Sequence, residues 1–120
     1  GGAPAGDPYL LSTQLAAMVV TEAGMRAVNL GPNTPVAAFA HAVAEHQPRL
    51  VWISISTPLA PARARSMSRW LDTLPTTTTI VIGGPQSRTL SNLPARAVRA
   101  TSMAELAAAA GSIVKRQRAS

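Results

Sequence analysis

A chain of 120 residues, 47 % of them apolar, has the size and composition of one folded domain with its own core. It contains no cysteine, which excludes disulfide bridges and thiolate metal sites and fits a reducing, cytoplasmic setting, and no apolar run approaches the ~20 residues that span a bilayer. The formal net charge of +6 comes mainly from arginine. This charge suits an acidic partner, such as nucleic acid or a phosphate-bearing ligand, and it is equally explained by a genome that favours Ala and Arg codons.

The first expected element is a helix that begins at Asp7 and Pro8. Asp7 has the side chain of a helix N-cap, and proline is favoured at the first helical position. Gly24 can end this helix, because glycine readily adopts the left-handed conformation of a C-cap. Apolar residues follow at helical spacing, so we expect the buried face to consist of Leu11, Leu15, Met18 and Val19.

A short strand over residues 27–30 and a second helix are expected next. The helix opens at Thr34 and Pro35 by the same combination of cap and proline. Residues 50–56, LVWISIS, form a mostly apolar, β-prone run, which is typical of a central parallel strand buried on both faces. The expected inner face of the second helix consists of Val36, Phe39, Ala40 and Val43.

The second half of the chain continues the alternation. A third helix is expected over residues 61–74, followed by a strand over residues 79–82 that Gly83 and Gly84 stop, and a weak strand over residues 97–100. Ser102 and Glu105 have the spacing of a capping box. They predict a last helix from residue 103 to about residue 115.

This order of elements predicts the fold class. Helices that alternate with strands indicate an α/β domain, here a doubly wound, flavodoxin-like parallel sheet of about five strands with helices on both faces. The first helix has almost nothing before it, so we expect the first strand to lie upstream of Gly1 or to be truncated at residues 1–4. The domain is expected to cover residues 1–114, followed by a basic tail over residues 115–120.

Ligands of doubly wound sheets bind outside the carboxyl ends of the strands. That rule selects residues 6–12, 54–58 and 83–87, all rich in small or hydroxyl side chains. Gly83 and Gly84 would let a ligand approach the backbone, and Ser54 and Ser56 offer hydroxyl groups. The same residues also have a purely structural explanation, because glycine and proline form turns and small side chains let helices pack on a sheet.

The three segments, in this order, resemble the signature of the cobalamin-binding domain found in methyltransferases, mutases and light-sensing transcriptional regulators. The family signature is Asp-x-His-x-x-Gly, then Ser-x-Leu, then Gly-Gly. The resemblance extends from residue 6 to about residue 113, and residues 29–35 and 50–52 are most similar to the regulator branch, in which the domain is C-terminal in MerR-type regulators. The cofactor-binding residues that the resemblance implies are Asp7, Tyr9, Ser12, Ser54, Ser56, Gly83 and Gly84.

In that family the His binds cobalt from below, and the dimethylbenzimidazole tail of the cofactor lies beside the serine and the glycine pair. This sequence has Tyr9 in place of the His, Ser12 in place of the motif glycine and Ser56 in place of the Leu. A phenol must lose its proton to bind a metal well, whereas imidazole is a neutral ligand. We therefore expect no metal-ligating residue, Asp7 to act as a helix cap, and cobalamin to bind weakly, atypically or not at all. His41 and His46 lie too far along the chain to replace the missing ligand.

The sequence predicts no enzyme. It lacks a Ser-His-acid set, a Walker motif and the acidic cluster of a receiver domain. The resemblance favours a ligand-sensing or oligomerising regulatory domain of a transcriptional regulator, which associates with itself and reaches DNA through an upstream domain, without contact to a membrane. The alternative is a corrinoid-binding carrier domain of a methyltransferase or mutase system.

Overall fold

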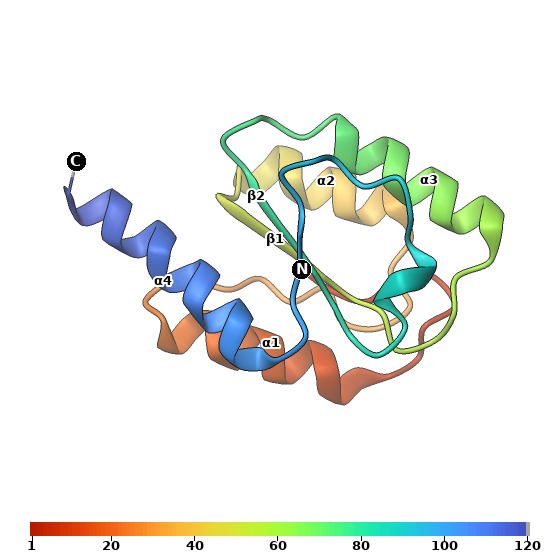
Figure 1. Cartoon of the computed structure of the whole chain (residues 1–120), viewed down its shortest axis with the longest axis horizontal. Coiled ribbons are helices and arrows are strands. Elements are labelled where there is room, and N and C mark those ends of the chain that lie inside the picture. The colour runs from red at the N-terminus through yellow and green to blue at the C-terminus, as the bar shows by residue number, and fades with distance from the viewer. Residues whose placement is uncertain (120) are drawn as a thin grey trace.

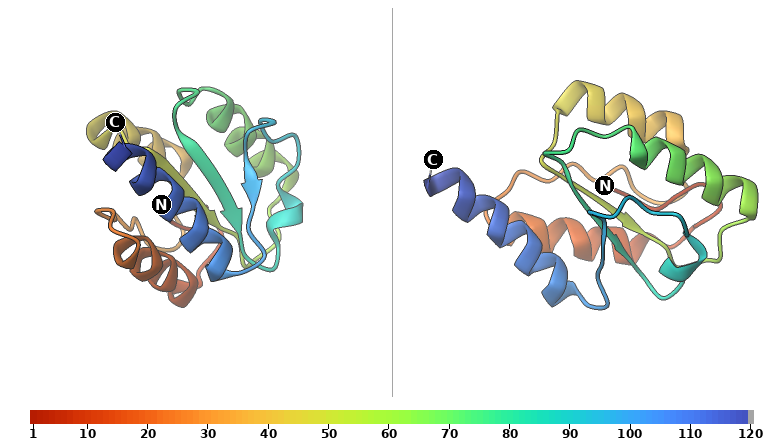
Figure 2. Two further views of the ribbon diagram at one scale, coloured as in Figure 1. Left: turned by 60° about the vertical axis from the view of Figure 1, so that its left-hand side comes forward. Right: turned by 45° about the horizontal axis from the view of Figure 1, so that its top comes forward.

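The computed structural model describes residues 1–119, which form a three-layer α/β structure. A parallel sheet lies in the middle, with α1 and α4 on one face and α2 and α3 on the other (Figures 1 and 2). The doubly wound α/β class predicted from the sequence is confirmed. The elements in chain order are α1 Leu10–Glu22, α2 Val36–His46, β1 Leu50–Ser54, α3 Pro61–Asp72, β2 Thr79–Gly83, the 3-10 turn η1 Ser87–Thr89, β3 Val98–Arg99 and α4 Met103–Ala119.

The sheet has three regular strands in the order β1-β2-β3, so the expected five are not confirmed. The β1–β2 pairing runs from Leu50 opposite Thr79 to Ser54 opposite Gly83. At the other edge of β1, Gly2 makes a single parallel bridge with Ile53, and Pro4 makes another with Thr34 in the segment before α2. Residues 1–4 thus lie in the position expected for the first strand without forming a regular ladder.

The strand expected at residues 27–30 is not a strand. This segment is extended and is held by backbone hydrogen bonds to Gly1, from the Gly1 nitrogen to the Val28 carbonyl (2.8 Å) and from the Leu30 amide to the Gly1 carbonyl (2.8 Å). The pairing is too short for a ladder. The expectation of a strand here was therefore right about the extended shape of the segment and wrong about its regular pairing.

β1 is buried on both faces, as its apolar sequence predicts. Successive side chains of a strand point to opposite faces. Val51 and Ile53 therefore belong to the core cluster beneath α2 and α3, and Leu50 and Trp52 belong to the cluster beneath α1 and α4. This central strand fixes where its carboxyl end, and the loop after it, come to lie.

The buried face of α1 is the reverse of the one expected. Leu11 is 66 % exposed and Met18 57 % exposed, whereas Thr13, Ala16 and Val20 are buried. Small side chains on the inner face let α1 approach the sheet and α4 closely, and a helical period alone does not say which face is inside. The outer face of α1 is left with an apolar stripe, hereafter the α1 stripe, formed by Leu11, Leu15 and Met18.

Neither of the expected N-caps acts as one. The N-cap of α1 is Tyr9 and that of α2 is Pro35, and neither makes a side-chain cap hydrogen bond. The hydroxyl of Thr34 donates to the Gly31 carbonyl at 3.0 Å and so closes the preceding turn instead. Gly24 does follow α1 with a positive φ of 104°, as expected for a residue after a helix C-cap.

Half of the predicted capping box of α4 is confirmed, because the Glu105 side chain accepts from Thr101 and not from the amide of Ser102. The Glu105 amide donates to Ser102 Oγ (3.3 Å), and the Glu105 carboxylate accepts from the amide (3.1 Å) and hydroxyl (2.6 Å) of Thr101. The Thr101 side chain and then its backbone amide lower the pKa of Glu105.

α4 continues to Ala119, past the expected end near residue 115, and its last turns project beyond the rest of the molecule (Figures 1 and 2). Of the expected basic tail, residues 115–119 are thus helical, and Ser120 lies outside the described residues. None of the helices in residues 1–119 has both the length and the apolar character needed to cross a membrane.

Candidate functional site

A cavity of about 540 Å³ lies between the sheet, α1 and α4, at the carboxyl ends of the strands. This is the edge at which doubly wound sheets bind ligands. Of the predicted site residues, Ser12, Ser54, Gly83 and Gly84 line this cavity, and Asp7, Tyr9 and Ser56 do not. The predicted motif residues thus form two groups: one lines the cavity, and the other forms the loops beside it.

Asp7 joins the loop before α1 to the loop after β1. Its side chain is 1 % exposed, and its Oδ2 accepts hydrogen bonds from the amides of Ser56 (2.5 Å) and Thr57 (3.3 Å). Its Oδ1 accepts from the Tyr9 amide at 3.2 Å. The predicted role of helix N-cap is therefore wrong, because the carboxylate is used almost entirely by a loop far away in the sequence.

The two serines that depart from the family signature lie next to each other. The hydroxyl oxygens of Ser12, in the first turn of α1, and Ser56, after β1, are 3.5 Å apart. Ser54 is buried at the end of β1, and its side chain makes no hydrogen bond within residues 1–119. Its hydroxyl is thus available to a ligand in the cavity.

The structure explains the two glycines at the end of β2 differently: Gly83 is the last residue of the strand, and Gly84 follows it. A Cβ on Gly83 would have only the Ala100 carbonyl oxygen nearby, at 3.7 Å, so the missing side chain leaves free space in the cavity. A Cβ on Gly84 would lie 2.7 Å from the carbonyl carbon of Ile55, and the residue has φ +97°. Gly84 is therefore required by the packing of the chain on itself, and Gly83 is not.

Tyr9 stands at the entrance to α1 and is 58 % exposed. The two histidines lie on α2, which covers the opposite face of the sheet (Figure 1). His41 pairs with Glu45 there, with 3.6 Å between Nε2 and Oε2. Within residues 1–119 no group of three His, Cys, Asp or Glu residues could hold a metal ion. The site therefore has hydroxyl groups and open space, and no imidazole.

Three polar cavity residues were missed by the sequence analysis: Arg88, Thr101 and Ser102. Thr101 and Ser102 follow β3 after one residue, so the rule that ligands bind at the carboxyl ends of strands, applied to that strand as well, would have found them. Arg88 lies in η1, and Arg99 hydrogen-bonds to the backbone of this turn. The Arg99 guanidinium donates to the carbonyls of Ser87 (2.5 Å) and Leu90 (2.5 Å).

Comparison with solved structures shows that the chain shares its α/β fold with proteins of known structure. The chain is similar to the methanol:cobalamin methyltransferase complex of Methanosarcina barkeri, with a TM-score of 0.79 and 16 % identity over 95 % of this chain and 45 % of that one. It is also similar to the monomethylamine corrinoid protein of the same organism (TM-score 0.71, 18 % identity, 93 % and 55 % covered).

A third similar structure is a cobalamin-binding protein from Desulfitobacterium hafniense (TM-score 0.64, 20 % identity, 98 % and 56 % covered). The chain thus spans about half the length of the structures that it matches. No protein-family profile and no curated protein sequence matches it. At these identities the comparison establishes the fold, and the chemistry must come from the residues of this chain.

The residues around the cavity fit the nucleotide tail of a corrinoid, and they include no ligand for its cobalt. The space beside Gly83 and the hydroxyl groups of Ser12, Ser54 and Thr101 suit a nucleotide tail, which carries a flat base and polar sugar and phosphate groups. The residues that line the cavity include no histidine, and Tyr9, which the sequence analysis aligned with the family's His, lies outside that lining.

Proposed function

We propose that this domain is a corrinoid-binding carrier domain that holds its cofactor by the nucleotide tail, without a side chain of the protein bound to cobalt. The proposal rests on one observation, the cavity between the sheet, α1 and α4 that Ser54 and Gly83 line at the carboxyl ends of β1 and β2. The residues around it bind and orient, and none of them forms a catalytic set. We therefore assign carriage and not catalysis to this domain.

The regulator hypothesis remains the second candidate, together with DNA binding through an upstream domain. It is supported by the sequence resemblance at residues 29–35 and 50–52. The carrier is favoured because one similar structure is a methyltransferase complex and another a monomethylamine corrinoid protein. The regulator and carrier hypotheses differ in one measurable property. A regulator's affinity for DNA must change when its ligand binds.

The proposal is tested by comparing methylcobalamin with cobinamide, which has the corrin ring and lacks the nucleotide tail. We expect methylcobalamin to bind at least about tenfold more tightly, a difference of about 1.4 kcal/mol, because only its tail can enter the cavity. The Gly83→Val variant should bind methylcobalamin no more tightly than cobinamide, since the valine side chain occupies the free space beside β2. Equal affinities for the two compounds, measured by absorbance titration, would overturn the proposal.

Gly111→Ala is the matched control for the glycine variant. A Cβ on Gly111, in α4, meets nothing within 4 Å, so this change should leave the affinity for methylcobalamin unaltered. Thermal unfolding of both variants shows whether the fold is retained, and any loss of binding is then assigned to the cavity.

Replacing Tyr9 with His should restore the missing ligand. Tyr9 is exposed and its side chain makes no hydrogen bond within residues 1–119, so the change costs little stability. We expect Tyr9→His to raise the affinity for methylcobalamin about tenfold and to give the absorption spectrum of a nitrogen-ligated cobalt, while Tyr9→Phe gives neither. An unmodified domain that already shows the spectrum of cobalt bound to a protein nitrogen would contradict the assignment.

The domain is also proposed to associate with a second copy of itself through the α1 stripe. The stripe is apolar, and α1 carries no charged residue before Glu22, so two chains of net charge +6 can meet there with their positive charges apart. Replacing Leu11 and Met18 together with Gln should weaken the dimer at least tenfold in sedimentation experiments. Ala62→Gln, on the exposed face of α3, serves as the control and should change nothing.

A further inference from the structure

The cavity between the sheet, α1 and α4 is lined by two tiers of residues, and the same four elements or their ends contribute to both. On β1 and β2, Trp52 pairs with Val81 and Ser54 with Gly83, and alternate residues of a strand face the same way. On α1 and α4, residues four apart share a face, and both helices begin at the carboxyl ends of the strands. The outer tier, at those ends, therefore consists of Ser12, Ser54, Gly83 and Ser102, and the inner tier of Ala16, Trp52, Val81 and Leu106, all of which line the cavity.

The two tiers differ in polarity. The outer tier carries three hydroxyl groups, and that of Ser54 is buried without a hydrogen bond within residues 1–119. The inner tier consists of aliphatic side chains and one indole, all at most 4 % exposed. Main-chain polar groups of a strand lie in the plane of the sheet and bond neighbouring strands, so they do not face the cavity. The inner tier thus offers a ligand apolar surface.

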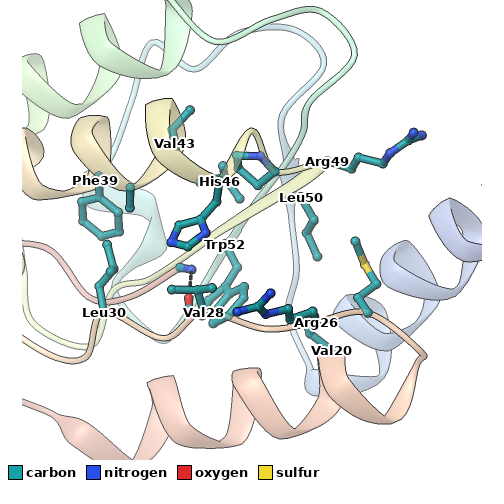
Figure 3. Close-up of a pocket in the computed structure, with 15 residues that line it drawn as sticks. Val20, Arg26, Val28, Leu30, Phe39, Val43, His46, Arg49, Leu50 and Trp52 are labelled. Carbon is teal, nitrogen blue, oxygen red and sulfur yellow. Dashed lines mark hydrogen bonds between the residues drawn. The ribbon is translucent and has the colours of Figure 1, made fainter.

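The indole nitrogen of Trp52 is the one polar side-chain atom in the inner tier. It is buried and has no hydrogen-bond partner within residues 1–119. Trp52 also lines a smaller cavity, of about 230 Å³, at the edge of β1, where Figure 3 shows its ring beside Val28 and Arg26. Arg26 is not among the residues that line the larger cavity. Because protein atoms cover the indole nitrogen, a ligand in the larger cavity finds neither a charge nor a free donor at the inner tier.

We propose that the inner tier selects corrinoids by the base of their nucleotide tail, accepting a benzimidazole and rejecting a purine. This inference rests on the proposed function. Sugar and phosphate connect the base to the corrin ring, so the base is the free end of the tail and lies deepest when the tail enters from the carboxyl ends of the strands. Two residues of a parallel strand advance about 6.6 Å, which is roughly the length of a two-ring base, so a base that begins at Ser54 ends at Trp52.

The two kinds of base differ at their deep end. The six-membered ring of dimethylbenzimidazole carries only carbon, whereas that of adenine carries an amino group and two ring nitrogens. Against Ala16, Val81 and Leu106 these polar groups lose water and find no partner, which is unfavourable. The five-membered rings of both bases carry the same two nitrogens, so the outer tier, with Ser54, meets both bases alike.

The test compares methylcobalamin with the methyl corrinoid that carries adenine in place of dimethylbenzimidazole, by absorbance titration of the full chain. We expect the adenine compound to bind at least about tenfold more weakly. Val81→Thr should reduce this preference at least about threefold, because its hydroxyl group can pair with adenine in the inner tier. Ser54→Ala should weaken the binding of both compounds by the same factor.

Val51→Thr is the matched control. Val51 and Val81 are 3 % and 2 % exposed on neighbouring strands, but Val51 belongs to the core cluster beneath α2 and α3. It should therefore cost similar stability and leave the preference unchanged. Ala16→Ser repeats the test on α1, where a serine hydroxyl can bond the carbonyl one turn earlier, so the variant stays folded even if Val81→Thr does not.

The remaining outcomes separate this inference from the proposed function. Equal affinities for the two corrinoids, both higher than for cobinamide, would overturn the selection by base and leave the proposed function standing. Affinities no higher than for cobinamide would overturn the proposed function and this inference with it. A change of preference in Val51→Thr as large as that in Val81→Thr would show that the inner tier does not make the selection.

Discussion

Replacing Asp7 with alanine is expected to lower the free energy of unfolding by about 3 kcal/mol and the unfolding temperature by roughly 10 °C. The buried carboxylate accepts from the amides of Tyr9, Ser56 and Thr57. Without it these three donors lose their partner in a partly buried region, and each unsatisfied group there costs about 1 kcal/mol, toward the low end of the ~1–3 kcal/mol of a fully buried one. Denaturant unfolding followed by circular dichroism measures the loss.

Two variants bracket this expectation. Asp7→Asn keeps the shape and one oxygen and replaces the other oxygen by a donor, so it should lose part of the stability but less than the alanine variant. Asp72→Ala removes an exposed carboxylate at the end of α3 and should stay within about 0.5 kcal/mol of the parent. A stability loss in Asp7→Ala no larger than that in Asp72→Ala would show that the two loops hold together without the carboxylate.

The loss of Asp7 should also weaken corrinoid binding, because the residue fixes the geometry around the site without touching its cavity. The loop that it holds carries Ser56, whose hydroxyl meets that of Ser12 at the cavity's border. This effect rests on the proposed function. It is separated from simple unfolding by titrating methylcobalamin at a temperature where the variant remains folded.

Much of the fold could be predicted because its signals are local. The apolar run of β1, the proline that opens α3 and the capping residues of α4 each act over a few residues, and all three elements begin where the sequence places them. The inner face of α1 could not be predicted, because two faces of this helix are apolar. The choice between Leu11 and Ala16 depends on how closely the sheet and α4 approach, which no local pattern contains.

The sequence predicted which residues of the candidate site lie together, but not what each of these residues does. The strand-end rule and the resemblance brought Ser12, Ser54 and Gly83 to one cavity. Asp7 has the residue type and position of an N-cap, and only the fold shows that its partners lie 49 and 50 residues away. A loop contact at that separation leaves no periodic trace in the sequence.

The adjacent glycines Gly83 and Gly84 differ in why the structure needs a glycine at each position. Both belong to the predicted glycine pair, yet only Gly84 combines a positive φ of 97° with a backbone neighbour, Ile55, where a Cβ would lie. Backbone cannot move aside as a flexible side chain can, and a residue other than glycine is strained at this φ.

Gly84→Ala is therefore expected to lower the free energy of unfolding by about 3 kcal/mol, and Gly83→Ala by less than about 1 kcal/mol. The two variants should rank in the opposite order when the affinity of the folded protein for methylcobalamin is compared instead of the stability. A Cβ on Gly83 lies in the cavity, so Gly83→Ala should weaken methylcobalamin binding while the domain stays stable, whereas Gly84→Ala should weaken binding mainly through the loss of folded protein, because its Cβ meets the Ile55 backbone. Unfolding and binding measured on both variants decide the matter. If Gly83→Ala changed stability and left binding untouched, the cavity beside β2 would be a packing feature, because a ligand there must meet the added methyl group.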